Sequence, residues 1–423
     1  MSAETTRLEK LDLVSQVVKA NPYPTYARLR AEAPAFLTRL PDGRLAWLIS
    51  RYPDVMAALK DPQLVKDRHR VGTQHRMRFE RFFEPFFRSL QFTMLDLDPP
   101  DHTRLRNLVH MAFTPRLVER LRERIQALAN RLLDRASEQG ELELVADYAL
   151  PIPATVIADL LGVPAADRDR FHRWSSRLVS VSSGRDLLSA LPSVLLFTRY
   201  LRRLIRQRRL EPHDDLITAL VQAEDGGDRL NADELISMIL LLLVAGHETT
   251  VNLIATGMLA LLEQPDQLRR LRAEPELLRN GTAIEELLRY TSPVQFATER
   301  YAVESVKASD STIPAGALVL GVIGSANHDE VQFAQPEVLD LGRTPNPHLA
   351  FGQGIHYCLG APLARLEAQI AFETLLRRLA DIELAVAPES LPWRPGVFLR
   401  GVERLPLRVR AGARMIALSP SSG

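Results

Sequence analysis

The chain has 423 residues, one cysteine and a formal net charge of +1, with 46% hydrophobic and 25% charged residues. This composition is typical of a globular protein, and the near-zero net charge gives no reason to expect nucleic acid or a membrane surface as partner. A single cysteine excludes an intrachain disulfide, and the first ten residues lack the apolar core of a signal peptide, so we expect a cytoplasmic protein.

Helical periodicity dominates the chain. Thr114 can cap a helix that has Pro115 at its first position, and one apolar face then follows at Leu117, Leu121, Ile125, Leu128 and Leu132. Asn231 and Glu234 form a capping-box pattern ahead of a long helix, from about residue 232 to beyond 262. Its apolar run 235–244 is half the roughly 20 residues of a membrane span, which predicts a buried helix. A further helix is expected over 283–290.

Strand-like segments are fewer, at 46–50, 295–303 and 318–323, the last after a turn at 313–316. No Gly/Ser-rich linker, low-complexity tract or repeat divides the chain. We therefore expect one mainly α structural unit with a minor β region over 1–423, in which 419–423 form a frayed tail.

The long predicted helix contains the polar stretch Ala245-Gly-His-Glu-Thr-Thr250. Burial of such groups is costly unless they have partners or a role. The Thr249 hydroxyl can bond to the carbonyl four residues back, that of Ala245, and open a groove in the helix. Glu248 is adjacent to Thr249 and points elsewhere, so the two can share protons only through water. A kinked core helix with satisfied polar groups is the alternative.

The only cysteine lies in Phe351-Gly-Gln-Gly-Ile-His-Tyr-Cys-Leu-Gly360. A charged sulfur needs hydrogen-bond donors around it, and the helix expected to open at Pro362 brings its partly positive start beside Cys358. Glycines at 352, 354 and 360 allow the backbone to pass close to a flat macrocycle. An isolated cysteine is usually a small buried hydrophobe. The spacing of Phe351, Gly354, Cys358 and Gly360 favours an axial iron ligand instead.

Four motifs appear in a consistent order: D-P-P-x-H-T-R-L-R at 98–106, A-G-x-[DE]-T-[TS] at 245–250, E-x-x-R at 286–289 and F-x-x-G-x-x-x-C-x-G at 351–360. Together they resemble the cytochrome P450 family, specifically its soluble bacterial members. The resemblance implies a triangular, mainly α fold with a minor β region. It also implies haem b, with Cys358 as the thiolate ligand of the iron.

The resemblance also implies roles for individual residues. The haem propionates would be held by four basic residues: His102, Arg106, Arg300 and His356. Ala245 and Phe351 would border the haem. Thr249 would hydrogen-bond the oxygen substrate, and Glu248 would supply protons for O–O cleavage. Glu286, Arg289 and Arg343 would form a buried salt-bridged network that maintains the fold, whereas Arg104 would face solvent.

The implied activity is insertion of one oxygen atom from O2 into a small apolar organic substrate, by hydroxylation or epoxidation. Electrons would come from a separate ferredoxin or flavodoxin with its reductase. This acidic partner would dock on a group of arginines: Arg104, Arg116, Arg120 and Arg122. A helix face that is merely exposed to solvent would explain these arginines equally well. Substrate contacts would come from 65–92, 170–195, 240–244, 294–297 and 397–398. An arginine within the first of these, which is rich in phenylalanine (Phe79, Phe82, Phe83, Phe86 and Phe87), is a candidate anchor for an acidic substrate end.

Two other functions stay open. A peroxide-driven enzyme of the same fold would not need the proton relay of Glu248 and Thr249. A haem-containing sensor or carrier without catalysis would not need it either. Product formation under an electron supply distinguishes them from an oxygen-dependent enzyme.

Overall fold

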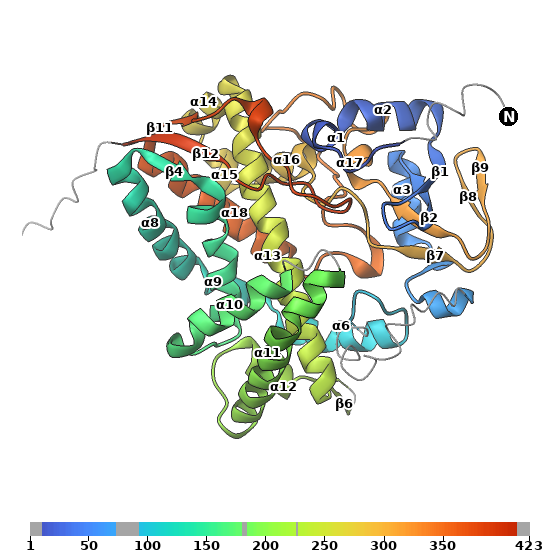
Figure 1. The fold of residues 1–423 in the computed structure, drawn as a ribbon, viewed down its shortest axis with the longest axis horizontal. Coiled ribbons are helices and arrows are strands. Elements are labelled where there is room, and N and C mark those ends of the chain that lie inside the picture. Colours follow the sequence, from blue (N-terminus) through green and yellow to red (C-terminus); the bar gives the residue numbers. More distant parts are fainter. Residues whose placement is uncertain (1–10, 73–92, 180–183, 226, 413–423) are drawn as a thin grey trace, which may run out of the picture.

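The computed structural model describes residues 11–72, 93–179, 184–225 and 227–412. Helices occupy most of this part of the chain, and Figure 1 shows the long helix α13 crossing its middle. Helices α8 to α12 lie on one side of α13, and the main sheet lies on the other side with α1 to α3. The helices are α1 Gln16–Ala20, α2 Tyr23–Glu32, α3 Tyr52–Lys60, α6 Asp101–Ala112, α7 Pro115–Glu119, α8 Arg122–Gln139, α9 Pro151–Leu160, α10 Arg168–Val179, α11 Gly184–Leu210, α12 Leu216–Gln222, α13 Ala232–Glu263, α14 Pro265–Ala273, α15 Glu276–Arg279, α16 Thr282–Thr291, α17 Ile323–Ala326 and α18 Ala361–Arg378.

The strands form two larger sheets and two short hairpins. The five-stranded sheet has the order β1-β2-β10-β7-β3, and the three-stranded sheet has the order β11-β12-β4. β5 pairs with β6, and β8 pairs with β9. The strands are β1 Ala35–Arg39, β2 Leu45–Ile49, β3 Leu64–Val65, β4 Glu141–Glu143, β5 Glu224–Asp225, β6 Asp228–Arg229, β7 Arg300–Ala302, β8 Val306–Ala308, β9 Ser311–Ile313, β10 Leu318–Gly321, β11 Leu379–Leu384 and β12 Pro406–Ala411. The expected mainly α fold with a minor β region is confirmed.

Helix α13 begins where the capping box predicts. The Asn231 side chain accepts hydrogen bonds from the backbone N–H groups of Asp233 and Glu234, and the Glu234 carboxylate accepts from the Asn231 N–H. In the described part of the chain, α13 is the one helix long and apolar enough to cross a membrane, and 56% of its most apolar window is buried inside the protein. Its apolar side chains therefore belong to the core.

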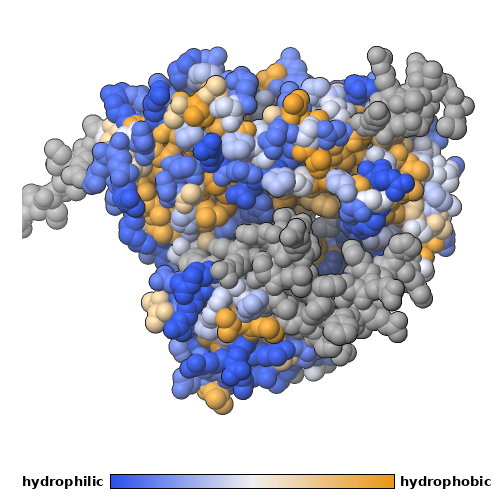
Figure 2. Space-filling model, viewed as in Figure 1, coloured by the Kyte–Doolittle hydropathy of each residue, from blue (hydrophilic) through white to orange (hydrophobic). Residues whose placement is uncertain are grey.

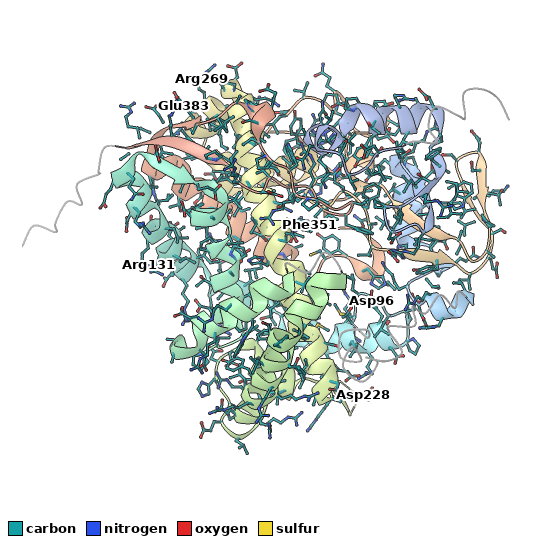
Figure 3. All side chains as sticks on the ribbon, viewed as in Figure 1. Asp96, Arg131, Asp228, Arg269, Phe351 and Glu383 are labelled. Carbon is teal, nitrogen blue, oxygen red and sulfur yellow. The ribbon has the colours of Figure 1, made fainter. Side chains whose placement is uncertain are left out.

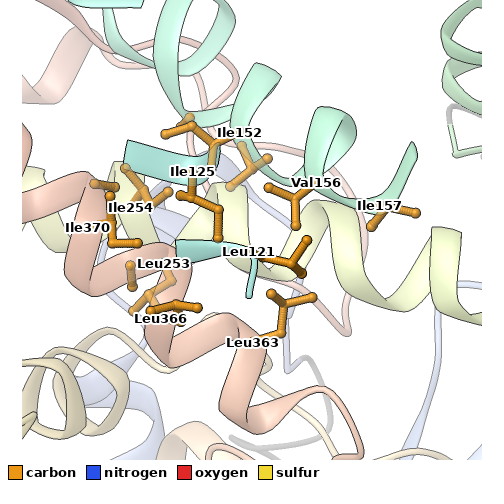
Figure 4. Close-up of a cluster of buried hydrophobic side chains, with 14 of the residues drawn as sticks. Leu121, Ile125, Ile152, Val156, Ile157, Leu253, Ile254, Leu363, Leu366 and Ile370 are labelled. Atoms are coloured by element: carbon orange, nitrogen blue, oxygen red, sulfur yellow. The ribbon is translucent and has the colours of Figure 1, made fainter. Parts of the chain in front are cut away.

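The core around α13 is built from α8, α9 and α18. Figure 4 shows Ile125 of α8, Ile152, Val156 and Ile157 of α9, Leu253 and Ile254 of α13, and Leu363, Leu366 and Ile370 of α18 in one apolar cluster. The visible outer surface is largely hydrophilic with scattered hydrophobic residues (Figure 2). Helix α18, which begins just after Cys358, therefore packs against α13 through its apolar face.

Three predicted elements differ from the structure. The strand expected over 295–303 is limited to β7, because Phe296 pairs with Val322 and Val294 with Leu399 only as isolated bridges. The strand expected over 318–323 ends at Gly321, and α17 begins at Ile323. Thr114 caps its helix through the Leu117 N–H, as predicted, but that helix ends at Glu119 and a second helix, α8, carries the apolar face onward.

Candidate functional site

The loop that carries Cys358 is shaped by a close approach between Gly354 and the end of α3. Gly354 has φ +73°, and a Cβ there would lie 2.8 Å from the Leu59 carbonyl oxygen, so only glycine fits. Gly360 is less constrained, because its φ is negative and a Cβ there would lie 4.0 Å from the Cys358 sulfur, an ordinary contact. The Cys358 N–H donates to the Phe351 carbonyl at 2.9 Å. The loop therefore closes on itself and fixes the direction of the sulfur.

The surroundings of Cys358 act on the pKa of its thiol in opposite directions. Its side chain is exposed on one side, yet burial by the surrounding chain raises the pKa of the thiol. The Gly360 and Ala361 N–H groups and the charges of Arg106 and Arg365 act to lower this pKa. These donors lie at the start of α18, where a helix N-terminus favours an anion. The arrangement suits a sulfur that becomes a metal-bound thiolate.

Arg365, one turn into α18, holds the loop from behind. Its guanidinium carbon lies 4.5 Å from the centre of the Phe351 ring, and its Nε donates to the Glu285 carboxylate at 2.6 Å. Burial acts to raise the pKa of Glu285, but hydrogen bonds from Arg365 and His348 lower it to about 2. In the view of Figure 3, Phe351 is drawn near the middle of the molecule. No local sequence pattern links α18 to α16, so the pairing of Arg365 with Glu285 was not predicted.

The polar stretch of α13 has the geometry expected from its sequence. The Thr249 hydroxyl donates to the Ala245 carbonyl at 2.8 Å. A Cβ on Gly246 would lie 3.2 Å from the Cδ1 atom of Ile157, so glycine lets α9 approach closely. Val244 and Ala245 are exposed, although the residues on either side of this stretch are mostly buried. An accessible turn with apolar side chains therefore interrupts the buried part of α13 beside Thr249.

Glu248 points away from Thr249. Its carboxylate lies 3.6 Å from an Nη1 atom of Arg394, in the segment between α18 and β12. The Arg394 side chain is held in turn by the Val402 carbonyl at 3.3 Å. As expected, the acid and the alcohol lie on different sides of α13. Arg394 was not predicted as a partner of Glu248, because the two are separated by 146 positions in the sequence.

His102 and His356 are brought together from distant segments. Their ring centroids are 4.3 Å apart. Both ring nitrogens of His102 and the Nε2 atom of His356 are buried without a hydrogen-bond partner among the described residues. Burial, then the charge of Lys66, lowers the pKa of His356 to about 2, and burial also lowers the pKa of His102. Such buried ring nitrogens need an external partner.

The two predicted arginines border the same cluster. Arg106 donates to the Tyr357 carbonyl at 2.7 Å, directly beside Cys358. Arg300 donates to the carbonyls of Leu64 and Leu59, while its Nε is buried without a partner. Burial lowers the pKa of both guanidinium groups. The unpartnered donors of His102, His356 and Arg300 fit the two propionates of a haem, and Cys358 fits its iron.

Comparison with known proteins identifies the family. Residues 196–384 match the family model described as "Cytochrome P450". The polyketide biosynthesis cytochrome P450 PksS of Bacillus subtilis is 45% identical over 394 residues, 92% of this chain and 95% of PksS. The cytochrome P450 monooxygenase PikC of Streptomyces venezuelae is 45% identical over 95% of this chain and 94% of PikC.

This chain belongs to the cytochrome P450 family.

Solved structures agree with this assignment. The PksS structure superimposes with a TM-score of 0.88, at 43% identity over 95% of this chain and 100% of PksS. The structure of P450BioI in complex with hexadec-9Z-enoic acid ligated acyl carrier protein has a TM-score of 0.84, at 36% identity over 93% of this chain and 99% of that chain. The P450 fold, the haem-thiolate type of cofactor and monooxygenase activity follow from family membership.

Glu286 of α16 is the centre of a buried salt-bridged network. The Arg289 Nε donates to a Glu286 carboxylate oxygen at 2.7 Å, and both side chains have no solvent exposure. The Arg343 Nε donates to the other Glu286 oxygen at 3.1 Å. Backbone carbonyls of Asn327 and Pro336 complete the surroundings of Arg289. The predicted buried network of Glu286, Arg289 and Arg343 is confirmed.

The four arginines predicted to form a docking surface differ in their exposure and in their ion-pair partners. Arg104 does not simply face solvent: it forms a partly buried ion pair with Glu234 at the start of α13. Arg120 pairs with Asp214 at 2.5 Å, and Arg122 pairs with Glu119. Arg116 is exposed. The prediction for Arg104 was wrong because its partner lies 130 positions away.

The structure covers the predicted substrate contacts only in part. The phenylalanines at 79, 82, 83, 86 and 87 lie outside the described residues. Of the arginines in 65–92 that were candidates for the substrate anchor, Arg68 and Arg70 are described, and those at 76, 78, 81 and 88 are not. Residues 180–183 of the second predicted segment also lie outside them. Val397 and Phe398 pack against the cluster of the main sheet, where Phe398 contacts Phe296.

Proposed function

We propose that this P450 is a cytoplasmic, oxygen-dependent monooxygenase that hydroxylates or epoxidises a small apolar organic molecule on haem b. Cys358 would be the ligand of the iron. His102, Arg106, Arg300 and His356 would hold the propionates, with Ala245 and Phe351 bordering the ring. The observation that carries the proposal is the pair of Glu248 and Thr249 on α13, each held by a specific contact beside an exposed turn of a core helix.

When bound, the haem supplies the binding and activation of dioxygen. Two side chains of α13, those of Glu248 and Thr249, would transfer and position protons. Because the Thr249 hydroxyl donates its own proton to the Ala245 carbonyl, its oxygen remains free to accept a hydrogen bond from a donor in the neighbouring space. Glu248 lies on the other side of the helix, where Arg394 holds its carboxylate. Protons from Glu248 would therefore reach the Thr249 side through water.

The substrate class is proposed from the exposed turn and the relatives. Val244 and Ala245 offer apolar surface beside Thr249. PksS is named for polyketide biosynthesis, and P450BioI was solved with a fatty acid on an acyl carrier protein. Polyketide and fatty-acyl compounds, free or linked to a carrier protein, are therefore the first to screen. Low-spin to high-spin conversion of the haem reports binding.

Electrons would come from a ferredoxin or flavodoxin with its reductase. Of the arginines considered for docking, Arg116 is exposed and Arg120 and Arg122 lie on the surface in ion pairs. Charge reversal of Arg116 should raise the concentration of acidic partner that gives half-maximal reduction, and added salt should have the same effect.

The first experiment is the carbon monoxide difference spectrum of the reduced protein, for wild type and Cys358→Ser. A strongly red-shifted Soret band that is lost in the variant supports the haem-thiolate centre. A band typical of a histidine-ligated haem would refute it.

Turnover then separates the three functions. Product formed with O2, ferredoxin and reductase, and reduced in Thr249→Ala, supports the monooxygenase. Product formed only with peroxide and unchanged in Thr249→Ala would indicate a peroxygenase. Substrate-induced spectral change without product under either supply would indicate a sensor or carrier.

A further inference from the structure

A buried lysine faces Arg300 across the edge of the main sheet. β3 and β7 are antiparallel, with Leu64 opposite Ala302 and Val65 opposite Tyr301, which places Lys66 opposite Arg300 at the next position. Lys66 is 7% exposed and Arg300 is 6% exposed. Like charges directly opposite one another on neighbouring strands repel. Burial increases this repulsion, because there is little water to screen it.

The described surroundings of Lys66 compensate this charge only in part. Its Nζ donates to the Thr298 hydroxyl and to the Glu299 carbonyl, the latter at 3.0 Å, which uses two of its three N–H bonds. Asp98 lies near, but its carboxylate accepts hydrogen bonds from the backbone N–H groups of Lys66 and Asp67. Burial, and then the charge of Arg300, lowers the pKa of Lys66 to about 7. The carboxylates of Asp96, Asp98 and Glu299 act to raise this pKa, but burial and Arg300 outweigh them. Among the described residues, the third N–H of Lys66 has no partner.

The cluster beyond Lys66 consists of the residues assigned above to the haem propionates. Arg300, which lies opposite Lys66 in the register of β3 and β7, is one of these residues. The unpartnered nitrogens of His102, His356 and Arg300 lie in the same cluster. Buried nitrogens without partners need hydrogen-bond acceptors, and the two cations beside them, Lys66 and Arg300, favour acceptors that carry negative charge. Two carboxylates at the rim of a porphyrin have this chemistry.

We propose that Lys66 is a fifth basic residue that binds a haem propionate, paired with Arg300 across β3 and β7. The assignment rests on the proposed function, since it requires the haem. The propionate would accept the third N–H of Lys66 and the Nε–H of Arg300, and it would neutralise the repulsion between them. It would also tie β3, which follows closely on α3, to the cofactor.

The test compares haem loss among lysine variants of the holoenzyme. Ferric protein is mixed with excess apomyoglobin, and haem transfer is followed by absorbance for wild type, Lys66→Met, Lys66→Arg and Lys60→Met. Lys60 ends α3 and is exposed, so it controls for loss of a lysine. We expect Lys66→Met to lose haem about tenfold faster, the scale of one charge-assisted hydrogen bond. Lys66→Arg should stay near wild type, and Lys60→Met should match it. Equal rates for Lys66→Met and Lys60→Met would overturn the proposal.

A second measurement separates propionate binding from general destabilisation. The propionate bending bands of the resonance Raman spectrum, recorded on protein that retains haem, should shift in Lys66→Met and not in Lys60→Met. Faster haem loss with unchanged bands would show that Lys66 acts only through the fold. The carbon monoxide spectrum of wild type tests the proposed function by itself. A normal thiolate band with no effect of Lys66→Met on haem loss refutes only the role of Lys66.

Discussion

The Arg394 guanidinium lies 3.6 Å from the Glu248 carboxylate and links the segment before β12 to the middle of α13. The pair is partly buried, with side-chain exposures of 29% and 24%. Arg394 is fixed through its backbone N–H to Gly401 and through its side chain to Val402. The carboxylate proposed to deliver protons is therefore oriented by a segment far from it in the sequence.

Arg394→Ala should lower the yield of product per reduced nicotinamide consumed by a few-fold, because an unrestrained Glu248 delivers protons less often to the right place. Glu248→Gln should have a larger effect, of the order of 10²-fold, as expected for loss of a positioned general acid. Arg394→Lys should restore most of the coupling. The free energy of unfolding should change by at most about 1 kcal/mol in Arg394→Ala, as for other partly exposed ion pairs. Full coupling in Arg394→Ala would contradict a positioning role.

Glu367, on α18, should make stability fall as the pH rises. Its side chain is 1% exposed, and burial raises its pKa to about 8 from 4.5, while a hydrogen bond with Thr250 acts the other way. Between pH 4.5 and 8 the folded protein keeps this proton and the unfolded chain releases it. The free energy of unfolding therefore decreases by up to about 1.4 kcal/mol per pH unit in this window.

Glu367→Gln should remove that pH dependence and be more stable than wild type at pH 8, in urea unfolding measured from pH 5 to 8. Glu373→Gln, on the partly exposed side of the same helix, is the matched control. Parallel pH curves for wild type and Glu367→Gln would show that the carboxyl group is not held neutral in the fold.

Arg289→Ala should destabilise the protein by about 3–5 kcal/mol, because it leaves the fully buried Glu286 without its closest counter-charge. Arg279→Ala removes an exposed partner of Glu276 and should cost less than about 1 kcal/mol. Urea unfolding of both variants measures the difference. Similar losses of unfolding free energy in the two variants would mean that Arg343 alone compensates the charge of Glu286.

Gly354→Ala should destabilise the cysteine loop more than a simple change of backbone preference would. Gly43 and Gly354 both have positive φ, but a Cβ on Gly43 would meet nothing within 4 Å, whereas one on Gly354 would meet the Leu59 carbonyl oxygen at 2.8 Å. Gly43→Ala should cost about 1–2 kcal/mol, and Gly354→Ala should cost at least about 1 kcal/mol more. Gly354→Ala should also shorten haem retention. Equal losses of stability in Gly43→Ala and Gly354→Ala would show that the loop moves to accommodate the added Cβ without a further free-energy cost.

Local patterns predicted the parts of the site that lie within one segment. The capping box of Asn231 and Glu234 and the bond from Thr249 to Ala245 each depend on residues at most four apart in the sequence. Contacts between distant segments could not be predicted in this way. Lys66 faces Arg300 only through the register of β3 and β7, and the pairing of Arg104 with Glu234 is likewise set by packing.

The strand expected over 295–303 illustrates the same limit. Its composition suits a strand, but a strand also needs a continuous partner. Here the partner changes at almost every position: the Gln295 N–H bonds to Phe398, the Ala297 N–H bonds to Gly321, and Arg300 pairs with Val319 of β10. Only the tertiary arrangement decides where such pairing becomes regular.

Arg365 gives the cysteine loop a property that the ten-residue motif lacks. Its guanidinium covers the Phe351 ring and is anchored by Glu285 of α16, which also accepts from His348. A graft of residues 351–360 into a foreign scaffold would transfer the thiol without the clamp that aims it. An engineer who wanted a portable thiolate centre from this protein would have to move α16, the segment around His348 and the first turns of α18 together.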